Sequence, residues 1–138
     1  MRLVVRVGLI ALAAIQWTTG LWMQLLPESF YRDFPTVDLT PPFSEHLMRD
    51  FGGASVGLAA VITAAAVWMD ARLTVIALLA YLAYSVPHLV FHLGHLHDAS
   101  SAQTAFIVIS LGGSALLPSA LLALAVVEGR RRRAKNGA

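Results

Sequence analysis

Residues 73–98 read LTVIALLAYLAYSVPHLVFHLGHLHD, an apolar run that ends in four of the five histidines of the chain. His88, His92 and His95 are spaced i, i+4 and i+7, so a helix would carry all three on one stripe. Lipid offers no hydrogen bonds, and an imidazole within a membrane therefore needs a polar partner. We expect the rest of the chain to be arranged around whatever this stripe faces.

The composition is that of an integral membrane protein. Of 138 residues, 57% are hydrophobic and 13% are charged, and the mean hydropathy is +0.68, far above that of a soluble domain. Four apolar runs are long enough to cross a hydrocarbon core of about 30 Å. They predict membrane spans at residues 5–26, 45–69, 73–97 and 103–128, followed by a basic tail at 129–138. We therefore predict an all-α fold, a single four-helix transmembrane bundle.

The charges indicate how this bundle is oriented. In a four-span arrangement Arg2, Arg6, Arg72 and the bases of the tail fall on one side. Six of the eight acids and all five histidines fall on the other side. By the positive-inside rule, both termini are cytoplasmic, and the histidines of this multi-pass cell-membrane protein face the extracytoplasmic side. The basic tail indicates topology and attraction to anionic membrane lipid, and nucleic acid is not an expected partner because no folded recognition module accompanies the tail.

Residues 27–44, PESFYRDFPTVDLTPPFS, separate the first two spans. Prolines at 35, 41 and 42 argue against one continuous helix. The four aromatic residues of this segment allow two interpretations: a connector at the level of the lipid headgroups, or a lid over a site. We favour the connector, because aromatic residues are common at membrane interfaces.

The second span supplies polar residues at the height of the histidines. Ser44 is a good N-cap, and EHLMRDFGGASVG follows at residues 45–57. With a rise of about 1.5 Å per residue, Asp50 and His92 should both lie roughly 6–8 Å below the outer boundary, and His88 roughly 12 Å below it. We therefore predict that two adjacent antiparallel spans bring their polar side chains together.

Imidazole and carboxylate groups at one depth are suitable ligands for zinc, iron or copper. The leading set has His88, His92 and His46 as metal ligands, with Asp50 as a fourth ligand or as the acceptor that orients a histidine. The remaining polar residues are expected to support the ligands or to line an access path: Glu45, Arg49, His95, His97 and Asp98. The leading function is a metal-binding membrane protein, with catalysis left open.

Two alternatives remain open. If Arg49 neutralises Asp50, the polar cluster is structural, and the protein is a non-enzymatic accessory or assembly subunit of a membrane complex. Gly53 and Gly57 would then form a small-residue face that a neighbouring helix or a second copy approaches closely. A haem held by one or two axial histidines is the other alternative.

Two segments carry a resemblance to known proteins. The sequence EHLMRDFG, residues 45–52, enters the second span, and the pattern PHxxxHxxH, residues 87–95, leaves the third. With these segments in a four-span layout, the chain resembles small actinobacterial membrane proteins of the DoxX-like group. The resemblance implies a fold and a membrane location, and it assigns no reaction.

Overall fold

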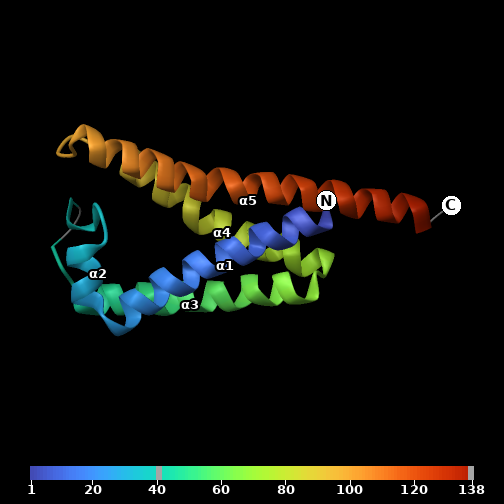
Figure 1. Ribbon diagram of the computed structural model, residues 1–138, viewed down its shortest axis with the longest axis horizontal. Helices are drawn as coiled ribbons and strands as arrows, with labels where there is room; N and C mark the ends of the chain where they lie inside the picture. Colours follow the sequence, from blue (N-terminus) through green and yellow to red (C-terminus); the bar gives the residue numbers. More distant parts are fainter. Residues whose placement is uncertain (40–41, 137–138) are drawn as a thin grey trace.

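The computed structural model describes residues 1–39 and 42–136, which are helical almost throughout (Figure 1). The four long helices are α1 (Arg2–Leu25), α3 (Glu45–Trp68), α4 (Ala71–Leu93) and α5 (Ser101–Asn136), with α2 (Pro27–Asp33) and the 3₁₀ turn η1 (Val37–Leu39) between α1 and α3. Each long helix has the length and hydropathy to cross a membrane. The predicted all-α fold with four candidate spans is therefore confirmed. Residues 40–41 of the connector and 137–138 of the tail lie outside the described part.

Side-chain caps fix where the helices begin. Ser44 and Asp70 each accept a hydrogen bond from the backbone N–H three residues ahead, at the starts of α3 and α4. At the start of α5, Ser100 and Gln103 form a reciprocal capping box, in which each side chain accepts from the backbone N–H of the other. The predicted N-cap at Ser44 is thus confirmed.

The third predicted span is longer than the helix it describes. α4 ends at Leu93, and the N–H of Gly94 donates back to carbonyl oxygens in the last turn. His95 therefore lies in the turn that leads to α5. The predicted three-histidine stripe is correct only for His88 and His92, because the helix ends at Leu93, before the third histidine.

The long helices form a ring in which each contacts two neighbours. α1 packs against α3 and α5, and α4 packs against the same two helices. Figure 1 shows the two chain termini on the same side of the molecule and α2 on the opposite side. From the terminal side toward α2, α1 and α5 diverge. The predicted pairing of the second and third spans is confirmed, since only Met69 and Asp70 separate α3 from α4.

The buried core lies toward the terminal end of this ring. Its members come from the first half of α1, the second half of α3, the first half of α4 and one position of α5: Val5, Leu9, Leu12, Ala13, Ile62, Ala65, Ala66, Ala77, Leu78, Tyr81 and Leu121. The burial of these side chains supplies the apolar contacts that hold the four helices together. The α2 end is packed differently, and it encloses a cavity.

α1 and α3 approach most closely where Gly20 faces Gly52. A methyl group added at Gly52 would lie 2.7 Å from the backbone nitrogen of Gln24 and 2.9 Å from the carbonyl oxygen of Gly20. The predicted small-residue face is a different one, and within this chain it is not the close contact. Gly53 and Gly57 are exposed, and a methyl group at Gly57 would meet nothing within 4 Å.

We expect Gly52→Ala to destabilise the bundle by about 1–3 kcal/mol, because the added methyl group would overlap backbone atoms that cannot rotate away. The measurement is thermal unfolding of the purified protein in mild detergent, followed by circular dichroism. Gly57→Ala is the matched control: it adds the same methyl group on an open face, where alanine favours the helix. Equal melting temperatures for the two variants would contradict the close contact.

Candidate ligand cavity

A cavity of about 280 Å³ lies between the long helices at the α2 end. Its apolar lining consists of Ile15, Met23, Phe30, Phe34, Val37, Met48, Phe51, Phe106, Ile107 and Leu111, and its polar lining of Gln16, Thr19, Thr36, Tyr81, Tyr84, His88, His92, Ser110 and Ser114. Small-molecule sites in proteins have this character, with mostly apolar walls and a few polar groups that orient the ligand. The cavity is therefore the candidate functional site.

One stripe of α4 provides the most distinctive wall. Tyr81, Tyr84, His88 and His92 all line the cavity, at helical spacings that place them on one face. The rings of Tyr84 and His88 are stacked, with centroids 5.3 Å apart and an interplanar angle of 26°. His92 meets His88 edge to face at 4.6 Å, and Phe51 of α3 packs against Tyr84 at 5.5 Å. The two histidines thus continue a row of aromatic rings.

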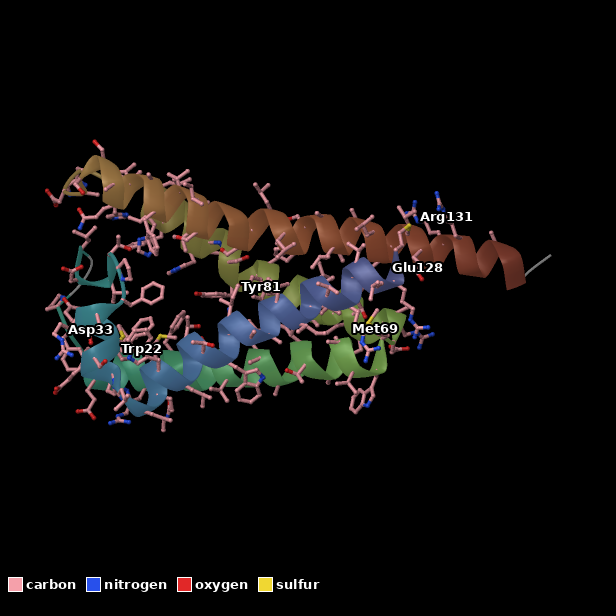
Figure 2. All side chains as sticks on the ribbon, in the orientation of Figure 1. Trp22, Asp33, Met69, Tyr81, Glu128 and Arg131 are labelled. Carbon is pink, nitrogen blue, oxygen red and sulfur yellow. The ribbon has the colours of Figure 1, made fainter. Side chains whose placement is uncertain are left out.

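Tyr81 marks the inner limit of the cavity. Its ring projects from α4 toward α1 (Figure 2). Tyr81 is only 2% exposed and Gln16 of α1 only 4%, and a side-chain hydrogen bond joins the two residues. This contact links α4 to α1, two helices that are not neighbours in the ring, at the level where the core ends and the cavity begins.

The connector between α1 and α3 covers the cavity on the α2 side. Phe30 and Phe34 are stacked at 4.9 Å, and Trp22 at the end of α1 packs edge to face against Phe30 at 5.5 Å. Phe34 also reaches Phe106 of α5, at 6.3 Å. The connector therefore extends from α1 to α5, and its aromatic side chains line the cavity. This position agrees with the lid interpretation, which the sequence left as the less favoured one.

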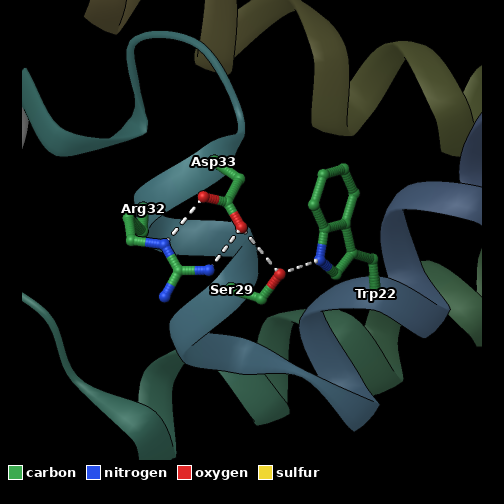
Figure 3. Close-up of polar contacts among 4 residues, drawn as sticks. All are labelled: Trp22, Ser29, Arg32 and Asp33. Atoms are coloured by element: carbon green, nitrogen blue, oxygen red, sulfur yellow. Dashed lines mark hydrogen bonds and ion pairs between the residues drawn. The ribbon is translucent and has the colours of Figure 1, made fainter.

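A chain of polar contacts holds α2 against α1 (Figure 3). Trp22 Nε1–H donates to Ser29 Oγ at 3.1 Å, and the Ser29 hydroxyl donates to Asp33 at 3.0 Å. Arg32 donates two hydrogen bonds of 2.7 Å to the same carboxylate. The hydrogen bonds from Arg32, and then from Ser29, hold the pKa of Asp33 below its ordinary value. α2 thus has its polar side anchored and its aromatic side over the cavity.

Sequence reasoning missed α2, although a signal for it was present. Pro27 occupies the first turn of the helix, where a missing N–H costs nothing, and Glu28 follows where a negative charge suits the helix dipole. Pro35, Pro41 and Pro42 exclude a continuous helix over the whole connector but leave room for a short one before them. The helix ends at Asp33, two residues before the first of them.

Two of the predicted site residues point away from the cavity. The imidazole Nε2 of His46 lies 3.2 Å from a carboxylate oxygen of Asp50, and these side chains are 89% and 63% exposed. Both lie on the outward face of α3, whereas Met48 and Phe51 of the same turns line the cavity. The rise along a helix predicts the height of a side chain, and it leaves the direction of that side chain open.

Arg49 does not neutralise Asp50 as the structural alternative assumed. Its guanidinium donates to Glu45 at 2.9 Å and to the backbone carbonyl of Gln24, at the end of α1, at 2.5 Å. A cation at this position satisfies a terminal carbonyl and complements the helix dipole. Glu45 and Arg49 therefore serve the contact between α1 and α3.

The remaining predicted residues lie in the exposed turn after α4. His95 stacks on Phe91 with ring centroids 4.2 Å apart, and its Nδ1 lies 2.7 Å from the Phe91 carbonyl oxygen. His97 Nε2 lies 3.1 Å from a carboxylate oxygen of Asp98. These contacts are local to the turn, and none of these three polar side chains lines the cavity.

The four predicted metal ligands are not assembled into one group. Within residues 1–39 and 42–136, no three histidine or acidic side chains are placed to hold a metal ion together. His46 and Asp50 form one pair on the outside, and His88 and His92 form another in the cavity. The predicted His/Asp cluster is therefore replaced by a two-histidine wall, because α3 turns its own polar pair outward.

Comparison with protein-family models, curated proteins and solved structures finds no match for this chain. The resemblance to the DoxX-like group therefore stays a prediction. The structure shows a four-helix protein whose helices are long and apolar enough to span a membrane.

Proposed function

We propose that the protein binds a small, flat and largely apolar ring molecule in this cavity and recognises a hydroxyl or carbonyl group on it. The observation that carries the proposal is the row of Phe51, Tyr84, His88 and His92 along one wall. Aromatic rings in contact favour stacked or edge-to-face arrangements, so such a wall favours a planar partner. Each imidazole adds one donor and one acceptor in its neutral form.

The part of the wall that α1 and α5 supply adds hydrogen-bond acceptors. The hydroxyls of Ser110 and Ser114 donate to backbone carbonyls of their own helix, at 2.6 and 2.8 Å. Thr19 of α1 donates in the same way at 2.9 Å. Each of these oxygens has used its proton and keeps a lone pair. A ligand hydroxyl can therefore donate to this wall, while a ligand carbonyl would accept from an imidazole N–H.

The size of the cavity limits its occupant. Ligand pockets usually measure about 300–1,000 Å³, and a cavity of about 280 Å³ lies just below this range. A molecule of about two fused rings is a suitable occupant. Haem is much larger than that, so the cavity does not favour the haem alternative.

We expect 2-naphthol, which has two fused rings and one hydroxyl, to bind more tightly than naphthalene, which lacks the hydroxyl. Binding is measured in lipid nanodiscs. Both dissociation constants are calculated from the concentration of the ligand in the lipid, so that different partitioning of the two ligands does not affect the comparison. In His88→Leu this preference should fall by about threefold to tenfold, the equivalent of one hydrogen bond. His46→Leu is the matched control, because that histidine is exposed and outside the cavity. The absence of binding, or an unchanged preference in His88→Leu, would contradict the proposed function.

A metal ion at the cavity histidines is a second candidate, favoured by the short distance between His88 and His92. Two imidazoles leave the other coordination positions to water or to a bound molecule. We expect the purified, untagged protein to retain zinc, iron or copper, and His92→Gln to abolish both this metal and any metal-dependent rise in melting temperature. Acidification should release the metal, since imidazolium cannot ligate. His46→Gln should keep the metal, and a metal-free wild type that is indifferent to all three ions would exclude this candidate.

We also propose that both chain termini are cytoplasmic, so that the cavity lies toward the extracytoplasmic side. Support comes from the concentration of basic residues near the termini and from the position of α2 and the cavity at the opposite end. A reporter fused after Lys135 should register as cytoplasmic, and one inserted at Thr36 as extracytoplasmic. The reverse pattern would place the cavity on the cytoplasmic side.

The accessory-subunit alternative stays a prediction. Open faces exist where a partner helix could approach, since methyl groups at Gly57, Gly112 and Gly113 would meet nothing within 4 Å. These faces are separate from the cavity, and the ligand-binding proposal does not depend on them.

A further inference from the structure

The exposed part of the cavity lining identifies where the cavity opens. Among the lining residues in the described part of the chain, only three are exposed: Ile15 of α1, and Phe106 and Ser110 of α5. Ile15 is 52% exposed and Phe106 is 36% exposed. The lining residues from α3, α4 and the connector are buried or half-buried. The mouth of the cavity therefore lies between α1 and α5.

The helix arrangement explains this opening. α1 and α5 are in contact toward the terminal side, where a methyl group added at Gly8 would collide with the Leu121 side chain. Figure 1 shows the two helices separating from there toward α2. Between α3 and α4, Phe51 fills the space at this level, with its ring centroid 5.5 Å from that of Tyr84 and 6.5 Å from that of His88.

The surroundings of the mouth are those of a bilayer. Residues 7–27, which include most of α1, contain no charged side chain, and neither do residues 99–127 of the α4–α5 turn and α5. Ser110 lies about 14 Å along α5 from Ser101, at a rise of about 1.5 Å per residue. That distance is about half of a hydrocarbon core of about 30 Å. The mouth therefore faces hydrocarbon.

The side of the cavity nearest water is covered. Phe30 of α2 and Phe34, the residue after α2, lie over the cavity, and the contact between Phe34 and Phe106 reaches α5. The contacts of Ser29, Arg32 and Asp33 hold this cover in place. Water would thus have to pass an aromatic layer that lipid does not meet.

Resting on the ligand-binding function above, we propose that the ligand enters sideways from the bilayer, between α1 and α5, and that it belongs to the class of molecules dissolved in membrane lipid. The mouth at Ile15, Phe106 and Ser110 is the passage. A molecule that reaches the cavity in this way need not cross the aromatic cover, and the hydroxyls and imidazoles inside give it polar contacts that the surrounding lipid lacks.

The test narrows the mouth and measures how fast a ligand exchanges. 6-Fluoro-2-naphthol is dissolved in the lipid of nanodiscs that hold the full chain, and fluorine exchange spectroscopy gives both its association and its dissociation rates at equilibrium. In Ser110→Phe and in Ile15→Trp, bulk is added at the mouth from opposite helices. Both rates should fall together by on the order of tenfold, since entry and exit share one passage.

Neighbouring positions supply the matched controls. Ile109 and Ile10 are 74% and 53% exposed and do not line the cavity, so Ile109→Phe and Ile10→Trp should keep wild-type rates. Thermal unfolding of all four variants establishes that they are folded. Binding with wild-type rates in both mouth variants would overturn the lateral route and leave the binding function intact. A complete lack of binding by the wild type would overturn both.

Discussion

The close contact between α1 and α3 at Gly20 and Gly52 is the constraint on which the other features depend. Because neither residue has a side chain, the two backbones approach to distances that a single methyl group would prevent. Arg49 strengthens the same contact by binding the end of α1. α4 must follow α3 after two residues, and α5 packs on α4. The ring then closes toward the termini, and the α2 end remains open enough to hold a cavity.

The long connector is a second consequence of this arrangement. Two helices as close as α1 and α3 could be joined by a short turn, yet residues 26–44 separate them. The extra residues form α2 and η1, which cover the end of the cavity nearest water and reach α5 through the contact of Phe34 with Phe106. The charged side of the connector faces outward, and Phe30 and Phe34 face the cavity. A segment that looks like an ordinary connector in the sequence thus provides one wall of the site.

Much of the fold was predictable from the sequence because it depends on composition and on local signals. Hydropathy predicted four spans, and Ser44 predicted the start of α3. Which face of α3 points inward was not predicted from the sequence. This one error accounts for two wrong assignments, the ligands on α3 and its small-residue face. The same turn of about 100° per residue that puts His46 and Asp50 outside also puts Gly53 and Gly57 outside. Gly52, Ser55, Ala59 and Ile62 form the stripe of α3 that is buried in the structure. Their helical spacing in the sequence was the signal that could have corrected both assignments.

The candidate site was predicted in part, for a physical reason. His88 and His92 lie in the cavity because α4 is apolar around the rest of its circumference, so its one polar stripe must turn inward. His46 and Asp50 lie near the end of their helix, where they are well exposed and pair with each other. The sequence predicts the position of a side chain along the helix axis. That position located the cavity residues only for His88 and His92, because an apolar helix surface leaves a polar side chain one direction to face.

The separation of core and cavity also affects how this protein can change. The hydrophobic core cluster is concentrated at the terminal end, and among the described residues Tyr81 alone belongs to both this cluster and the cavity lining. Residues such as Met48 or Leu111 face the cavity without belonging to the core cluster. We expect substitutions there to reshape the pocket with less effect on the framework, because stability is not uniform across a structure. Such an architecture favours evolutionary drift of ligand preference on a constant scaffold, and it gives protein engineers a set of positions to vary first.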